Sequence, residues 1–130
     1  MATLTPTLSL TDSTTFSDEV SFSVTDSLTT ASPAQSLSLA TAPSRSGNAI
    51  ELAPSLDARR YLFVRHTGKD SSGSTVTTEV YVETAGGAWF SKLAAGEWMF
   101  LPINANGAQL IQCRATSGTV VVEYAHWTKG

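Results

Sequence analysis

Apolar and polar residues alternate at every second position through long stretches of this chain, and glycine-containing turns separate those stretches. In Val76–Glu83, for example, the valines fall on one side of an extended chain, whereas Tyr81 and two glutamates fall on the other. A period of two is typical of a half-buried β-strand, and little of the chain shows helical spacing. The alternation therefore predicts an all-β fold, and 130 residues are enough for one domain with its own core.

Glycine turns divide the region 76–127 into five predicted strands. Gly86-Gly87 supplies the positive-φ residues of a tight hairpin, and Asn106-Gly107 is a second hairpin signal. We interpret the region as a β-meander that closes an antiparallel β-sandwich or jelly roll. The strands are expected at Val76–Glu83, Ala88–Leu93, Glu97–Ile103, Ala108–Ala115 and Thr119–Trp127.

The sequence before this region predicts a central strand at Tyr61–Thr67. Its apolar side chains fall on both faces, which indicates a strand that is covered on both sides or whose second face meets another subunit. Ala49–Leu52 predicts a shorter strand, and Pro54–Arg60 predicts a single helical turn or a loop. The loop Gly68–Ser74 lacks the glycine spacing and the following helix of a phosphate-binding loop, so we expect a solvated turn.

The first 45 residues are unusually rich in hydroxyl side chains. Twenty of them are Ser or Thr, yet Thr7–Leu10, Asp18–Thr25 and Ser36–Leu39 alternate as strands do. We expect an extended N-terminal arm over residues 1–45 and a β-sandwich body over residues 46–130, because the boundary run Ala42–Gly47 carries proline and glycine. The arm strands are either edge strands of the chain's own sandwich or pair with a neighbouring subunit by strand addition. We favour a partly intermolecular arm.

Charge and hydropathy argue against two classes of partner. Residues 1–45 carry four acids and one base, whereas residues 46–130 carry seven of each, so the whole net charge of −3 lies in the arm. Without a basic stripe, we expect no binding to nucleic acid. No run approaches the roughly 18–20 apolar residues that span a bilayer, and the first residues lack the pattern of a secretory signal. We therefore expect no membrane partner and assembly in a cytoplasm.

Histidine, serine and cysteine do not form a catalytic or metal-binding pattern. His66 and His126 fall within predicted strands, where packing or hydrogen bonding is the ordinary role, and no serine lies in a Gly-x-Ser-x-Gly turn. Cys113 alternates with apolar residues and is interpreted as a buried, inert thiol. No His/Cys cluster has metal-ligand spacing. We expect no enzymatic activity, no cofactor and no metal.

The carboxylates of the body are dispersed over several predicted strands. A glycosidase pair would need two of them to face one another across a cleft, which alternation alone does not indicate. We expect a solvated face on which they meet cross-strand partners such as Lys92 or Arg114. The residues are Glu79, Glu83, Glu97 and Glu123.

Large aromatic residues are the stronger candidates for a function. Trp127 shares a strand face with Val121, Glu123 and Ala125, opposite the more apolar set that we expect in the core. Large aromatics on a mixed face suit a subunit interface or the stacking of a sugar, and we favour the interface. The candidate interface residues are Trp89, Trp98, Trp127 and Tyr81.

Two segments resemble parts of small virion proteins of tailed bacteriophages. Ala94–Pro102 resembles their "A/P-G-E-x-x-x-L-P" turn and strand, and Ala115–Tyr124 resembles their final hairpin. With the Ser/Thr-rich arm, the chain is similar to capsid decoration (cement) proteins. That resemblance, over roughly residues 50–127, implies a small β-sandwich or jelly roll, commonly a trimer, located in the virion and bound to the major capsid protein or other virion subunits.

Under this resemblance the arm holds the protein to its neighbours and stabilises the shell. The arm anchors would be Leu8, Leu10, Val20, Phe22 and Val24. Similar Gly-Glu turns also occur in tail, neck and fibre-base proteins, so a component of the tail, neck or fibre base is an alternative. A carbohydrate-binding module for host recognition is the alternative from another class.

Overall fold

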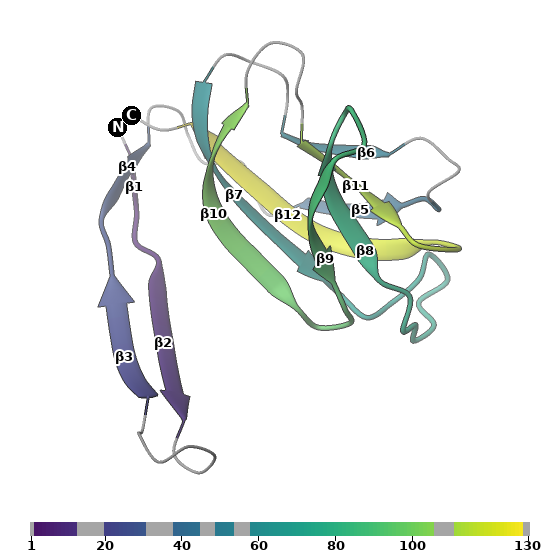
Figure 1. Cartoon of the computed structure of the whole chain (residues 1–130), viewed down its shortest axis with the longest axis horizontal. Coiled ribbons are helices and arrows are strands. Elements are labelled where there is room, and N and C mark those ends of the chain that lie inside the picture. Colours follow the sequence, from purple (N-terminus) through teal and green to yellow (C-terminus); the bar gives the residue numbers. More distant parts are fainter. Residues whose placement is uncertain are drawn as a thin grey trace.

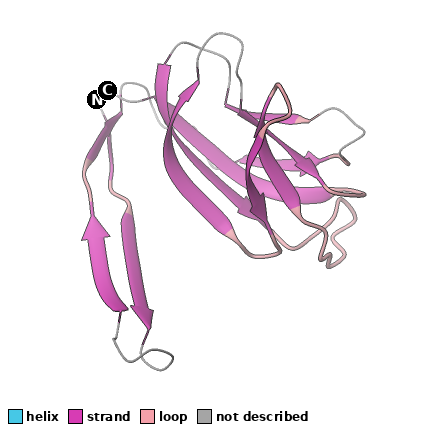
Figure 2. Ribbon diagram, in the orientation of Figure 1, coloured by secondary structure: helices cyan, strands magenta, loops and turns pink. Residues whose placement is uncertain are grey.

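The computed structural model describes residues 2–12, 20–30, 38–44, 49–53, 58–105 and 111–128. Within these ranges all regular structure is β-strand, with no helix (Figure 2). The strands are β1 (Ala2–Leu4), β2 (Thr7–Asp12), β3 (Val20–Thr25), β4 (Leu28–Thr30), β5 (Ser38–Ala42), β6 (Ile50–Ala53), β7 (Ala58–His66), β8 (Val80–Thr84), β9 (Trp89–Leu93), β10 (Trp98–Ala105), β11 (Ile111–Ala115) and β12 (Val120–Thr128).

Strands β5 to β12 form a body of two four-stranded antiparallel sheets (Figure 1). The first sheet has the order β5-β12-β7-β10, and the second has the order β6-β11-β8-β9. Successive strands lie in alternate sheets, except that β8 and β9 form a hairpin within one sheet. This is the strand order of a jelly roll. The expected antiparallel β-sandwich is therefore confirmed, and its topology is specified.

The meander expected over residues 76–127 is wrong. Only β8 and β9 are consecutive strands that pair with each other, whereas the chain crosses between the sheets before β10, before β11 and before β12. Alternation shows that a segment is a half-buried strand but not which sheet it joins, because both inner faces need the same pattern. The long-range pairs β12 with β7 and β11 with β8 decide the assignment.

Three local expectations also need correction. The strand expected from Val76 begins only at Val80, because Val76 donates its N–H to the Gly68 carbonyl outside the sheet, at 3.0 Å. Ala58–Arg60 belongs to β7 and not to a helical turn or loop, whereas residues 54–57 lie outside the described ranges. In the β8–β9 turn, only Gly87 has a positive φ.

The core lies between the two sheets and draws on both. Leu62 and Val64 of β7 meet Val80 and Val82 of β8, and Cys113 is fully buried among them, as expected. Burial raises the pKa of the Cys113 thiol, so the thiol stays protonated and inert. The remaining core residues are Ala42, Leu52, Leu93, Ile111, Ala115, Val120 and Val122.

His66 is a buried structural residue, as its position in a strand predicts. Its Nδ1 accepts a hydrogen bond from the Gly68 N–H at 2.9 Å, which leaves the proton on Nε2. Nε2 then donates to the Thr78 carbonyl at 2.6 Å. Both ring nitrogens therefore fix the chain around the exposed turn that follows.

In the turn after His66, the Ser72 hydroxyl donates a hydrogen bond to Asp70 and lowers the pKa of the Asp70 carboxyl.

The N-terminal strands form a separate two-stranded ribbon, defined as residues 2–12 and 20–30. β1 pairs with β4 and β2 pairs with β3, all antiparallel and in one continuous register from Ala2↔Thr30 to Asp12↔Val20. The ribbon projects beside β10 at one side of the body (Figure 1). By contrast, β5 pairs with β12 and is an edge strand of the body. Residues 13–19 and 31–37, which include parts of two predicted arm strands, lie outside the described ranges.

Candidate assembly interface

The ribbon has one apolar face and one hydroxyl face. In its register Leu8 lies opposite Val24 and Leu10 lies opposite Phe22, so these four residues share one face. The odd-numbered residues form the other face; all ten are Ser or Thr, and all are exposed. One cross-strand pair on that face, Thr7 and Thr25, is hydrogen-bonded through the hydroxyls at 3.0 Å. The ribbon is thus strongly amphipathic.

The apolar face is covered at the base of the ribbon and uncovered toward its distal end. Thr30 is only 1% exposed, and Leu4 and Leu28 are half-buried. Farther along the same face Leu8 is 37% exposed and Leu10 is 45% exposed. Phe22 and Val24 are exposed as well, whereas the Val20 side chain is outside the described set. Four of the five predicted arm anchors therefore lie together on one uncovered surface.

Pro6 separates the base of the ribbon from its distal part. The Asp26 N–H donates to the Pro6 carbonyl at 3.2 Å, but proline has no N–H with which to complete the pair. This break divides β1–β4 from β2–β3 without changing the register. Pro6 is therefore the natural position for a change in direction between the two parts.

The outer face of the sheet β5-β12-β7-β10 carries a cluster of aromatic rings. Phe100 stacks on Tyr61 with 6.1 Å between ring centroids and contacts Trp127 at 6.5 Å. Trp98 contacts Phe63, also at 6.5 Å. These separations are typical of favourable aromatic pairs. We call these five residues the aromatic face; Tyr61 is buried in it, whereas Trp98 is 53% exposed.

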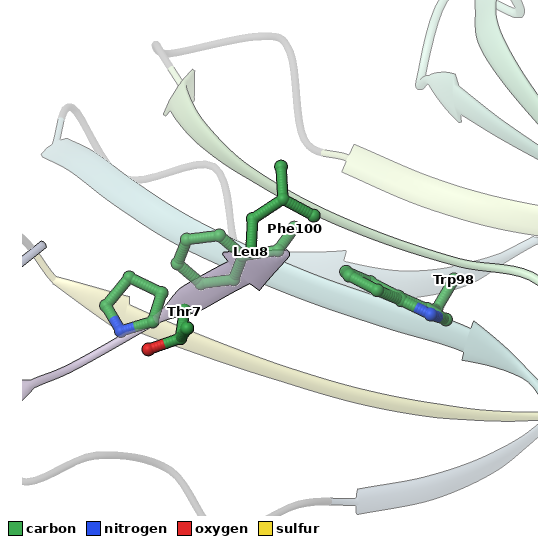
Figure 3. Close-up of a pocket in the computed structure, with 5 residues that line it drawn as sticks. Thr7, Leu8, Trp98 and Phe100 are labelled. Carbon is green, nitrogen blue, oxygen red and sulfur yellow. The ribbon is translucent and has the colours of Figure 1, made fainter. Parts of the chain in front are cut away.

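The ribbon meets the aromatic face at Trp98 and Phe100. A pocket of about 130 Å³ lies between these two rings and the ribbon residues Pro6, Thr7 and Leu8. Figure 3 shows Leu8 over Phe100, with Trp98 farther along the sheet. The apolar face of the ribbon and the aromatic face are therefore parts of one apolar surface.

Trp98 also lines a second hollow. It has a volume of about 410 Å³ and is lined by Phe63, Arg65, Gly96 and Trp98. The Arg65 side chain is half-exposed and pairs with Glu123 across the strands at 3.4 Å. The hollow thus combines two aromatic walls with one cation.

The four predicted interface residues fall on opposite sides of the body. Trp98 and Trp127 belong to the aromatic face, whereas Tyr81 and Trp89 lie on the outer side of the other sheet with their rings 5.5 Å apart. Trp89 and its neighbour Phe90 are both exposed. The structure therefore joins the predicted residues in two pairs and does not form a single patch.

Two of the carboxylates find their expected cross-strand partners, but one of them is not solvated. Lys92 forms an ion pair with Glu79, and this contact raises the pKa of Lys92. Glu83 pairs with Arg114 and also accepts a hydrogen bond from Gln112 at 3.1 Å, yet its side chain is only 1% exposed. The expectation of a solvated face is wrong at Glu83, because its strand neighbours cover it.

The sequence did not single out Phe63, Phe100 or Arg65 as functional residues. Phe63 and Phe100 lie opposite one another in the register of β7 and β10, and Arg65 lies opposite Trp98. The signal in the sequence was that Tyr61–Thr67 has apolar residues on both faces. This pattern indicated a second contact surface on the strand but did not identify the residues beside it.

Groups of three or more side chains able to hold a metal ion are absent from the described residues. The described part of the chain also contains no helix long and apolar enough to cross a membrane. No protein-family model matches the sequence, and no curated protein matches it.

Proposed function

We propose that this chain is a structural assembly protein, and that the assembly is a virion shell which it decorates and stabilises through its N-terminal ribbon. The body supplies a rigid platform, and the ribbon supplies the contact with neighbouring subunits, including the major capsid protein. Repetition of one modest contact over many copies then stabilises the shell.

The uncovered apolar face of the ribbon is the observation that carries the proposal. A two-stranded ribbon is marginally stable in water unless another surface covers it. Here the base of the ribbon is covered, whereas Leu10, Phe22 and Val24 remain exposed. Contiguous exposed apolar side chains framed by polar residues mark interaction sites. An assembly partner would complete the surface that the body leaves uncovered.

Two further observations favour a virion as the assembly. The segments Ala94–Pro102 and Ala115–Tyr124 resemble phage decoration proteins, and the jelly-roll order recurs in viral capsid domains. The second argument is an analogy of fold, because the same architecture also occurs in lectins and cupins. The ribbon distinguishes between these uses, since a free-standing lectin or cupin does not require an uncovered apolar arm.

Binding to shells tests the proposal through a matched pair of double variants. Leu10→Ser with Phe22→Ser makes the apolar face polar, whereas Ser9→Ala with Ser23→Ala changes the hydroxyl face at the adjacent register position. Cosedimentation with capsids of the virus that encodes the chain measures the affinity. Each large side chain that is buried contributes about 1.5–3 kcal/mol, so the first variant should weaken binding by about a hundredfold or more.

The hydroxyl-face variant should bind as the unchanged protein does. Both variants should keep the thermal transition of the body, because the four side chains are exposed in the isolated chain. Undiminished binding by the apolar-face variant, with its fold intact, would contradict the role of the ribbon.

Carbohydrate binding is the second candidate, and the hollow beside Trp98 favours it. An exposed indole next to the Arg65–Glu123 pair offers a flat apolar surface with polar groups at its edge, which suits a sugar ring. A glycan array with the unchanged protein and with Trp98→Ala distinguishes the two functions. Strong binding that depends on Trp98 supports the lectin-like function, and its absence leaves the structural one.

A further inference from the structure

We infer that the distal part of the ribbon of one copy occupies the hollow beside Trp98 on a second copy of this chain. This inference rests on the proposed function and deepens it, because it names a second copy as one of the neighbours that the ribbon binds. The interface joins the β2–β3 segment of one copy to the outer face of β7 and β10 in the next.

The recipient surface is already formed in the single chain. The hollow of about 410 Å³ has Phe63 and Trp98 as walls and Arg65 at its edge. The walls sit on two strands that pair with each other, Phe63 on the inner strand β7 and Trp98 on the edge strand β10, so this pairing holds them in place without a partner. Apolar anchors at protein interfaces commonly fill hollows of this kind on the partner.

The donor surface has the complementary composition. Phe22 and Leu10 lie side by side on the apolar face and are the exposed large side chains nearest the distal end of the described ribbon. Phe22 is the natural anchor, because an aromatic ring can contact both Phe63 and Trp98. The hydroxyl face would remain in water, as it does in the single chain.

The chain's own ribbon does not fill this hollow. Its residues Pro6, Thr7 and Leu8 line the smaller pocket with Trp98 and Phe100, whereas none of the described ribbon residues is among those that line the larger hollow. The β2–β3 part of the ribbon projects beside the body (Figure 1). Its side chains Leu10, Phe22 and Val24 stay exposed. Each copy therefore has both an unfilled hollow beside Trp98 and an exposed apolar ribbon face that could fill the hollow of another copy.

The distribution of charge favours a contact between the ribbon and the hollow over a contact between two ribbons. Residues 1–44 contain four acids and no base, so two ribbons stacked on their apolar faces would bring like charges together. Strand β7 contains Arg59, Arg60 and Arg65 and no acid. Of the acids near the hollow, Glu123 is paired with Arg65, and Glu97 accepts a hydrogen bond from the Ala94 N–H at 2.7 Å. Of these arginines, Arg65 lines the hollow, whereas Arg59 and Arg60 lie farther along β7, opposite Asn104 and Ile103. The strand that carries the hollow thus has only basic charges, which suits an acidic ribbon.

Sedimentation velocity over a concentration series tests whether the chain associates with itself in this way. Arg65→Glu and Phe22→Ser alter the two sides of the contact, and Lys69→Glu makes the same charge change at an exposed residue that does not line the hollow. The first two should raise the dissociation constant by about tenfold or more, because a like charge or a lost anchor costs at least about 1.4 kcal/mol. Lys69→Glu should leave the constant unchanged.

Thiol cross-linking between two different single-site variants identifies the contact itself. Thr11→Cys labels the distal hydroxyl face of the ribbon, Ala95→Cys labels the turn beside Gly96, and the native Cys113 is fully buried and does not react. A mixture of the two variants with a short bifunctional maleimide should give a cross-linked dimer. Thr29→Cys, at the base of the ribbon on the same face, is the matched control and should give little product with Ala95→Cys.

Each of the contrary outcomes overturns the inference in a distinct way. A chain that carries Thr11→Cys and Ala95→Cys together, and cross-links only within itself, would show that the ribbon folds onto its own hollow. A single monomeric species up to about 1 mM, the concentration at which a complex of about −4 kcal/mol forms, would show that the partner is another protein. If that monomer still binds shells through Leu10 and Phe22, the proposed function stands and only the identity of the neighbour fails.

Discussion

Glu83 and Arg114 show how single charged residues are accommodated in the body. Glu83 lies in the middle of a sheet with its carboxylate withdrawn from water, and one of its oxygens accepts from both Arg114 and Gln112. Its second oxygen has no hydrogen-bond partner within the described residues. A buried carboxylate is tolerated only while its partners compensate the lost hydration. Removing one partner of this pair should therefore destabilise the protein by more than the intact pair contributes to its stability.

Replacing Arg114 by alanine should destabilise the protein by about 3 kcal/mol or more, because it leaves a buried carboxylate uncompensated. Urea unfolding followed by tryptophan fluorescence measures the change. Glu83→Leu combined with Arg114→Met should recover most of the loss, since an apolar pair of similar size needs no compensation. A single Arg114→Ala variant with the stability of the unchanged protein would contradict the account.

The β8–β9 hairpin shows how much a turn depends on one residue. Gly87 has a φ of +81°, and the Gly87 N–H donates to the Thr84 carbonyl at 2.8 Å to close the turn. Gly86 next to it has an ordinary φ. The sequence predicted both glycines as turn residues, because a Gly-Gly pair does not show which member adopts the left-handed conformation. That choice follows from the geometry of the two strands.

Gly87→Ala should therefore cost about 1–2 kcal/mol, the cost of a left-handed L-residue. No atom lies within 4 Å of the added methyl group, so the cost is conformational and not steric. Gly86→Ala is the control in the same turn; its added methyl group would lie 3.8 Å from the Thr84 hydroxyl oxygen, and stability should change by less than about 0.5 kcal/mol. Thermal unfolding by circular dichroism compares the two, and equal losses would contradict the assignment.

At the scale of strands, the local sequence pattern predicted where strands occur better than which strands pair with one another. The alternation in Thr119–Trp127 indicated a strand where β12 lies, because burial of one face leaves a period of two in the residues, and the apolar run in Tyr61–Thr67 indicated a strand where β7 lies. It did not reveal that these two strands pair with each other, since pairing depends on contacts between residues far apart in sequence. The aromatic face was missed for the same reason, because its rings come from three strands.

The whole molecule joins the N-terminal ribbon to the jelly-roll body, and β5 shows where they divide. The ribbon ends at Thr30, whereas β5 pairs with β12 from Val120↔Ala42 to Tyr124↔Ser38 and contributes the fully buried Ala42 to the core. A hydroxyl-rich composition extends through both segments, so composition does not separate them. The pairing partner does: β5 completes the first sheet of the jelly roll, and β1 to β4 pair only with one another in the described structure.

Two truncations follow from this division and should behave differently. Removal of residues 1–30 takes away only the ribbon, so the remaining chain should keep a cooperative thermal transition while it loses shell binding. Removal of residues 1–44 also takes away β5 and leaves the edge of β12 and the core around Val120 and Val122 uncovered. In a body of this size a loss of about 2 kcal/mol lowers Tm by about 8–16 °C, and an uncovered strand edge promotes aggregation. Calorimetry with light scattering distinguishes the two, and equal Tm values for both truncations would mean that β5 does not stabilise the body.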